Sequence, residues 1–423
     1  MKSRERVLQA INHKQPDVVP VDFGATSATG INVSTLYHLL PHLGLRHRSP
    51  VISDTMQLLS LLDEDVTIAL GTDVVPLLGP KTKIGTTSKC NLAPFTMPDG
   101  TPALIPETVK YHVDKDGVYY QYPQGDVTAE YSMVMPAGGS FFDAIERSTP
   151  FDEDALDPET DFADFFTLWN DETAMHYEKA SIHLFHETDY AIACQFGQGG
   201  FGDLAKLPGP TVKSPKGIRH VEDFITAHIL YPDYIHEIFE KQCETALKNL
   251  EILKQSVGER IQIICVGGTD FGTQNGLYYS KEIFRSFYAP YIKRINNYIH
   301  KNTSWKTFFH SCGAISELLD DFIDIGTDII NPVQCSASGM DPEKLKSTYG
   351  DRIVFWGGGV DSQSVLSFGT PEEVSKQVKE RISIFNKNGG YVFASVHNIV
   401  ADTPSENIVA MIKTLAEARG ELR

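Results

Sequence analysis

Short apolar runs alternate with longer amphipathic segments along most of the 423-residue chain. Each run is rich in β-branched or aromatic residues and ends in Gly, Asp, Asn or His, which is typical of a buried parallel strand. The predicted strands are residues 19–24, 73–79, 190–197, 261–270, 306–313, 327–334, 352–360 and 390–398. Between them, apolar spacing predicts helices such as 233–256, 280–302 and 370–390. Eight strands that alternate with helices favour an α/β fold, a (β/α)₈ TIM barrel formed by one domain over residues 1–423.

One region departs from this alternation. Residues 83–140 are rich in Pro and Gly, and "PDG" and "KDG" stand as turn signals between short alternating segments. We therefore expect a small antiparallel β insertion between the second and third barrel strands. It would serve as a lid or as a contact in a homo-oligomer.

Composition narrows the class of protein and of partner. The chain is 41% hydrophobic, which is ordinary for a folded protein, and its net charge is −18. An acidic surface repels nucleic acid and anionic membranes, so neither is expected as a partner. The chain shows no apolar stretch of the roughly 18–20 residues that a membrane span needs. Its six cysteines are scattered without a CxxC pair, which is typical of reduced thiols, so we expect a cytoplasmic protein.

Side chains that can bind a metal, transfer a proton or form hydrogen bonds to a substrate lie at the carboxyl ends of the predicted strands. Enzymes with this fold have their active sites there. In chain order the candidates are Asp270, Gln274, Asn275, His310, Cys312, Cys335 and His397. His310 and Cys312 are two residues apart, so on one strand they would share a face at a spacing of about 6–7 Å. Imidazole and thiolate are the ligands that zinc favours, and a catalytic site keeps one position open. His310, Cys312, His397 and Cys335 therefore form a candidate zinc set. The competing interpretation is that each is an ordinary buried residue.

Several stretches resemble the uroporphyrinogen decarboxylase superfamily. They are "FFHSCGAI" (308–315), "DIINPVQCSASGMDPEKL" (328–345) and "GGYVFASVHNIVADTPSENIVAM" (389–411). The resemblance covers roughly residues 185–420, and within the superfamily it is to the cobalamin-dependent branch typified by methylcobalamin:coenzyme M methyltransferases. Decarboxylases of the family carry an arginine-rich stretch after the first strand, whereas this chain has "DFGATSATGIN" there, without arginine.

The resemblance implies a zinc site held by a His-x-Cys pair and a later Cys. His310 and Cys312 match the pair, but the later Cys falls at or next to His397. Either His397 replaces that cysteine or Cys335 takes its role from a neighbouring strand. The implied activity is transfer of a methyl group from a small methylated substrate, best a methoxylated aromatic, to the Co(I) corrinoid of a separate protein. A partner must supply the corrinoid because the sequence has no Asp-x-His-x-x-Gly cobalamin-binding stretch.

The resemblance also suggests roles for the residues after the fourth strand. Asp270 would orient a ligand or relay a proton, and Gln274 and Asn275 would hold the substrate by hydrogen bonds. Two other functions stay open: a metal-free decarboxylase of a smaller substrate, and a barrel that binds a ligand without catalysis.

Overall fold

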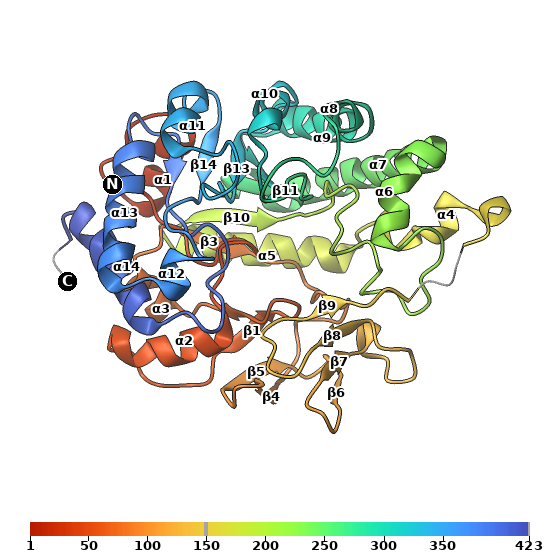
Figure 1. The fold of residues 1–423 in the computed structure, drawn as a ribbon, viewed down its shortest axis with the longest axis horizontal. Helices are drawn as coiled ribbons and strands as arrows, with labels where there is room; N and C mark the ends of the chain where they lie inside the picture. The colour runs from red at the N-terminus through yellow and green to blue at the C-terminus, as the bar shows by residue number, and fades with distance from the viewer. Residues whose placement is uncertain (148–150, 422–423) are drawn as a thin grey trace.

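The computed structural model describes residues 1–147 and 151–421, and at its centre lies a curled parallel sheet (Figure 1). Within those residues the sheet has seven strands, in the order β15-β14-β13-β12-β11-β10-β3. They are β3 (Val74–Leu77), β10 (Ala191–Gln195), β11 (Ile263–Gly268), β12 (Lys306–His310), β13 (Ile329–Asn331), β14 (Val354–Trp356) and β15 (Tyr391–Val392). Each falls inside a segment that the sequence predicts as a strand. Each also pairs with the next one along the chain, an arrangement that fits a TIM-type barrel.

The remaining predicted strand, residues 19–24, is reduced to a bridge. Val21 forms an isolated parallel bridge with Phe393, and the Asp73 N–H donates to the Val21 carbonyl at 2.7 Å. The N–H groups of Val21 and Phe23 instead donate to the side chains of Asp73 and Thr72, at 3.0 and 3.1 Å. Because these side chains replace main-chain partners, no regular ladder forms here. The structure thus has the α/β fold and the curled parallel sheet that the sequence predicts, with seven strands assigned instead of eight.

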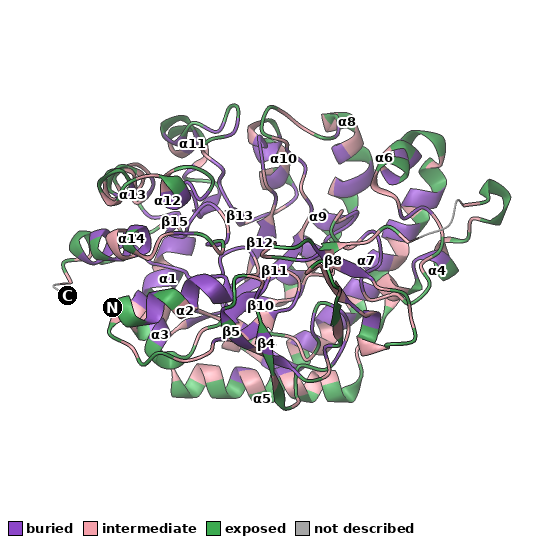
Figure 2. Ribbon diagram, turned by 60° about the horizontal axis from the view of Figure 1, so that its bottom comes forward, coloured by how far each residue is buried: buried purple, intermediate pink, exposed green. Residues whose placement is uncertain are grey.

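Helices cover the outer side of the sheet (Figures 1 and 2). The longer ones are α1 (Ser3–Ile11), α5 (Asp171–Glu187), α6 (Val221–Leu230), α7 (Pro232–Val257), α9 (Ala289–Asn302), α11 (Pro342–Tyr349), α13 (Pro371–Phe385) and α14 (Ser405–Ala418). The shorter ones are α2 (Val33–Leu39), α3 (Glu64–Leu70), α4 (Pro158–Asp161), α8 (Lys281–Ile283), α10 (Leu319–Asp324) and α12 (Val365–Phe368). None of the helices in residues 1–147 and 151–421 is long and apolar enough to cross a membrane.

The segment predicted as a helix over 370–390 forms α13, over Pro371–Phe385. Thr370 caps α13 and forms a capping box with Glu373. The segment predicted as one helix over 280–302 divides into α8, a π-helical turn at Phe284–Tyr288, and α9.

The inner face of the sheet is packed with side chains from alternate strand positions, because successive residues of a strand point to opposite faces. One buried cluster gathers them with two residues of α1, which packs against β3, β10 and β15. Its members are Val7, Ile11, Ala25, Val74, Ala191, Ala193, Ile263, Cys265, Phe308, Ile329, Val354, Trp356, Val392 and Ala394. Phe308 belongs to this inner face, so His310, two residues on, lies on the same face at the carboxyl end of β12.

Two small sheets lie to one side of the parallel sheet (Figure 1). One has the order β2-β1-β5-β4 and the other β6-β7-β8-β9. Their strands are β1 (Val51–Asp54), β2 (Leu59–Leu61), β4 (Leu92–Thr96), β5 (Pro102–Pro106), β6 (Tyr111–Val113), β7 (Tyr119–Gln121), β8 (Met133–Met135) and β9 (Asp143–Ala144).

The predicted turns of the 83–140 region form hairpins in these sheets. "PDG" joins β4 to β5, and "KDG" joins β6 to β7. The first sheet also contains β1 and β2, which precede β3 in the chain, because β1 pairs with β5. A separate buried cluster that includes Phe95, Ile105 and Met133 underlies the two sheets. Their role as a lid or an oligomer contact stays a prediction.

Candidate metal centre

His310 is the last residue of β12 and is held between the two neighbouring strands. It lies opposite Gly268 of β11 on one side and Asn331 of β13 on the other. The Nδ1 of His310 lies 2.6 Å from the Oδ1 of Asn331, which is fully buried. The Asn331 amide nitrogen in turn donates to the Trp356 carbonyl at 2.9 Å, so its Oδ1 must face His310. Because an amide oxygen only accepts, Nδ1 carries the proton and Nε2 presents its lone pair.

Cys312 lies beyond the end of β12, in a loop held by side chains of two neighbouring loops. Its N–H donates to the Asp270 carboxylate at 2.8 Å, and the Gly313 N–H donates to the Gln334 side-chain oxygen at 2.9 Å. The expectation that His310 and Cys312 share one strand is therefore wrong in detail, because the strand ends at His310. The loop nevertheless brings the Cys312 Sγ to 3.3 Å from the His310 Nε2.

Two glycines let this loop pack directly on the loop that carries Asp270. A Cβ on Gly313 would lie 2.2 Å from the Gly272 carbonyl oxygen, and a Cβ on Gly272 would lie 2.8 Å from the Cys312 carbonyl oxygen. Gly313 also has a φ of +86°, in the left-handed region that favours glycine. The position of Cys312 is thus fixed by backbone contact as well as by hydrogen bonds.

His397 reaches the same place from the loop that follows β15. Its neighbour Asn398 accepts a hydrogen bond from the Gly30 N–H at 2.6 Å and donates to the Ser27 carbonyl at 2.8 Å. These bonds fasten the loop to the segment after residues 19–24. They place the His397 ring 5.4 Å from that of His310, centroid to centroid, at an interplanar angle of 71°.

The three side chains together form a compact donor set. The ligand atoms of His310, Cys312 and His397 all lie within 4.8 Å of one another, and all three residues are half-buried. Two imidazoles and a thiol at this spacing suit a tetrahedral zinc ion, with the fourth position left for a substrate. The donor chemistry and the spacing both fit that metal.

The charge states of the free site are compatible with metal binding. Burial, and then the nearby His310, lower the pKa of His397 to about 4, so its imidazole is neutral at pH 7 and can act as a ligand. Burial and the Asp270 carboxylate raise the pKa of the Cys312 thiol well above its usual range. A metal ion would therefore have to displace a proton from Cys312 on binding.

Cys335 does not join this group. Its thiol donates to the Val333 carbonyl at 3.4 Å, within its own loop after β13. Burial raises the pKa of this thiol to about 11. Of the two alternatives left open by the sequence, the structure brings His397, and not Cys335, to the His310–Cys312 pair.

Asp270, Gln274 and Asn275, which the sequence analysis places around the metal, differ in how far they are exposed and in what they contact. The Asp270 carboxylate is 3.7 Å from the His310 Nε2 and also holds the Cys312 N–H, so it contacts both members of the pair. Gln274 is exposed and donates to the Gln363 side-chain oxygen at 3.3 Å. Asn275 is exposed, and its backbone N–H donates to the Thr273 hydroxyl at 3.1 Å.

Sequence reasoning missed Asn331 at this site and did not identify the partners of Gln363, a polar residue after a predicted strand. Asn331 stands at the end of "DIIN", in a strand that the sequence predicts, but its pairing with His310 depends on the register between β12 and β13. Gln363 accepts from both Gln274 and Gln334, at 3.3 and 3.4 Å, and so joins three loops at the carboxyl end of the sheet. The signal in the sequence is an amide side chain at or after the end of a predicted strand. Only the fold shows that Asn331 and Gln363 take part in this site.

Comparison with known proteins shows which family the second half of the chain resembles. The model of the uroporphyrinogen decarboxylase family matches residues 214–418, which include His310, Cys312 and His397. A curated uroporphyrinogen decarboxylase from Aromatoleum aromaticum is 20% identical over 243 residues, which make up 56% of this chain and 59% of that protein. Residues 214–418 therefore match the uroporphyrinogen decarboxylase family, which is the superfamily that the sequence resembles.

A solved structure extends the likeness of fold to nearly the whole chain. A methyltransferase from Methanosarcina mazei superposes with a TM-score of 0.54 at 16% identity, covering 99% of each chain. At that identity the match speaks for the fold alone. The chain thus shares its fold with that protein, and residues 214–418 match the model of an enzyme family.

Proposed function

We propose that the protein is a zinc-dependent methyltransferase that moves a methyl group from a small methylated substrate to the Co(I) corrinoid of a separate protein. The observation that carries the proposal is the His310–Cys312–His397 group, whose ligand atoms lie within 4.8 Å of one another. It stands at the carboxyl ends of parallel strands, where this fold holds its reaction centres. The fold is compatible with this activity, because it is shared over 99% of both chains with a methyltransferase from Methanosarcina mazei.

The donor set bears on which methyl donor is used. Zinc, when bound, supplies a Lewis acid for the heteroatom that carries the methyl group. Two neutral imidazoles and one thiolate leave one more unit of positive charge on the metal than a His–Cys–Cys set would. A more positive centre favours oxygen over the softer sulfur as the leaving atom. We therefore infer that the substrate is a methyl ether, best a methoxylated aromatic, and that the reaction is an O-demethylation.

The protein's own side chains hold this arrangement in place. Asn331 fixes the tautomer of His310, and Asp270 fixes the loop of Cys312. Gln274 and Asn275 are exposed near these loops and would hold the substrate by hydrogen bonds. The corrinoid comes from a partner protein, which must dock over the carboxyl ends of the strands to bring its cobalt to the methyl group.

A metal-free decarboxylase is the second candidate, and the family description and the curated relative both favour it. Against it stands the absence of arginine from residues 22–32, where family decarboxylases carry their arginine-rich stretch. Anionic carboxylates would find no such cationic partner there. A ligand-binding barrel without catalysis is the third candidate, and metal content together with turnover separates all three.

The deciding experiment has two stages. Protein purified without chelators or a His-tag is analysed for metal, together with the variants Cys312→Ala, His397→Ala and Cys335→Ala. We expect about one zinc per chain, lost in the first two variants and retained in the third. Methoxylated aromatics are then offered with Co(I) cobalamin, and methylation is followed by the visible spectrum of the corrinoid. Zinc without methyl transfer would favour a binding protein, and no zinc in any sample would return the chain to the decarboxylase interpretation.

A further inference from the structure

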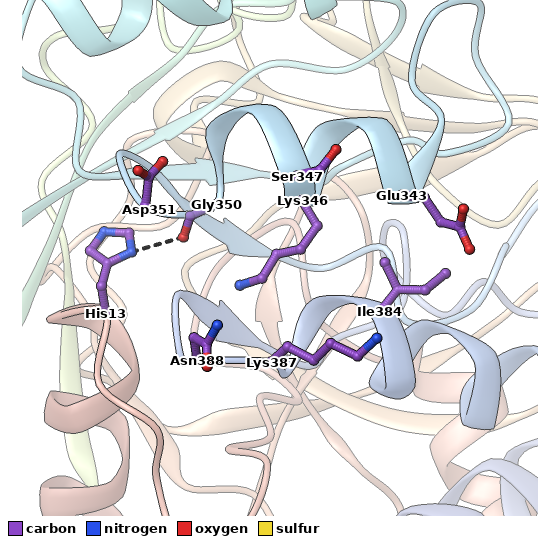
Figure 3. A pocket seen from close by; sticks show the side chains of 9 residues that line it. All are labelled: His13, Glu343, Lys346, Ser347, Gly350, Asp351, Ile384, Lys387 and Asn388. Carbon is purple, nitrogen blue, oxygen red and sulfur yellow. Dashed lines mark hydrogen bonds between the residues drawn. The ribbon is translucent and has the colours of Figure 1, made fainter.

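A cavity of about 600 Å³ lies far from the metal centre, at the amino ends of β14 and β15 (Figure 3). Its walls are one face of α11, the turn at Gly350, the end of α13 and the residues that follow it. His13, after α1, closes one side, and its Nδ1 lies 3.1 Å from the Gly350 carbonyl oxygen. The His–Cys–His group stands at the opposite ends of the strands, so the proposed methyl transfer does not use this cavity.

Lys346 reaches from α11 into this cavity (Figure 3). Its ammonium is half-buried and donates one hydrogen bond, to the Gly389 carbonyl at 2.6 Å. No carboxylate oxygen of the described residues lies within 4.0 Å of it, so it has no ion pair. Burial lowers the pKa of Lys346 to about 8. A lysine with this pKa is about one-tenth free amine at pH 7, and the cavity gives reagents access to it.

A second lysine lies on the floor of the cavity. Lys387 is exposed, and it makes no ion pair with any of the described residues. The carboxylates of Glu343 and Asp351 lie on opposite sides of the cavity (Figure 3), and the Asp351 charge raises the pKa of Lys346, although burial has the larger effect. The cavity is therefore lined by one half-buried amine, one exposed ammonium and two carboxylates.

We propose that Lys346 is a modification site that takes an acyl group from an acyl phosphate. The free amine nitrogen attacks the carbonyl carbon of the donor and forms an amide bond. The bond from that carbon to the phosphate oxygen breaks, phosphate leaves with its electron pair, and the amine proton passes to solvent. Lys387 supplies the positive charge that draws the anionic phosphate group into the cavity.

The surroundings of Lys346 tolerate the product. An acylated lysine keeps one N–H, which is what the single hydrogen bond to the Gly389 carbonyl requires. It loses the charge that burial disfavours. The cavity volume of about 600 Å³ leaves room for a small acyl group without displacing the neighbouring loops.

The test is site-resolved labelling of the intact protein with acetyl phosphate at pH 7.5, quantified by peptide mass spectrometry. Lys344 is the matched control, because it lies on the same helix and is exposed. A lysine of pKa near 8 holds roughly two hundred times more free amine at pH 7.5 than one near 10.4, although a less basic amine is intrinsically slower. We expect acetylation of Lys346 to be about tenfold faster than that of Lys344. Equal rates at the two lysines would overturn the proposal.

A second arm tests the donor class. The Lys387→Gln variant should slow acetylation of Lys346 by acetyl phosphate about threefold or more, but leave its reaction with an uncharged acetyl ester unchanged. An equal rate with acetyl phosphate in this variant would rule out the anionic donor. The rate at Lys346 should rise with pH, reach half of its maximum near pH 8 and level off above about pH 9. The other titratable groups that face it are His13, Glu343, Asp351 and Lys387.

Discussion

Asn331 offers a direct test of how the candidate metal centre is held. Replacing it with leucine, which has a similar size, removes the acceptor for the His310 Nδ1–H and the donor to the Trp356 carbonyl. Loss of a hydrogen-bonded partner of a metal-binding histidine lowers metal affinity by about 10- to 100-fold, or ~1.4–2.7 kcal/mol. The unpaired Trp356 carbonyl adds a folding cost of about 1–3 kcal/mol. We therefore expect weaker zinc binding together with lower stability.

Competition between the protein and a chromophoric chelator measures the zinc affinity, and urea unfolding measures the stability. Asn331→Asp separates the two effects, because its carboxylate still accepts from His310 but no longer donates to Trp356. That variant should lose stability and keep most of its zinc affinity. Asn296→Leu is a control, since Asn296 is equally buried but bonds to the Ile325 carbonyl, away from the metal centre. The reasoning is refuted if Asn331→Leu folds and binds zinc as tightly as the parent protein.

Three further predictions concern stability, and each is read by urea unfolding. Gly313→Ala should cost about 2–4 kcal/mol, because its Cβ would meet the Gly272 carbonyl oxygen at 2.2 Å and its φ is +86°. Gly100→Ala, with a φ of +87° and nothing within 4 Å, isolates the backbone cost and should lose only about 1 kcal/mol; equal losses would remove the steric argument. Asp73→Asn should cost about 3–5 kcal/mol, because Asp73 is 1% exposed and pairs with two arginines, at 2.6 and 3.1 Å; a loss below about 1 kcal/mol would contradict this. Burial raises the pKa of Asp22 to about 6, so its protonated form stabilises the fold below pH 4 and that contribution is lost as the pH rises towards 6. The stability of the parent protein relative to Asp22→Asn should therefore fall by about 2 kcal/mol between pH 4 and pH 7, and a difference that does not depend on pH would contradict it.

The sequence predicts the parallel strands well because buried strands between amphipathic helices leave a clear apolar signal. It fails at residues 19–24 for a local reason, since the side chains of Thr72 and Asp73 take the N–H groups that a neighbouring strand would otherwise pair. Apolar pattern alone cannot show that competition. Strand ends are also placed too late, as at His310, because the small residues "SCG" that follow it resemble a continuing buried strand.

The types of residue in the metal centre can be predicted from the sequence. Which individual residues bind the metal and which support them is harder to predict. His310 and Cys312 are marked by their spacing, and His397 by its place at a strand end. The support of the pair is not visible in the sequence, because Asn331 depends on strand register and Asp270 on contact between two loops. Both contacts join residues at least 21 positions apart, and nothing local encodes them.

The choice between His397 and Cys335 depends on the backbone that carries each. Val333 has a φ of +59°, a left-handed conformation that β-branched residues rarely adopt, and two residues later the Cys335 thiol donates back to the Val333 carbonyl. With a pKa of about 11 and a carbonyl partner, this thiol stays protonated at neutral pH. The neutral His397 ring offers a lone pair without giving up a proton, in a loop that Asn398 fastens in place. A metal ion would thus need to displace only the proton of Cys312, which is why a His–Cys–His set is chemically the less costly one here.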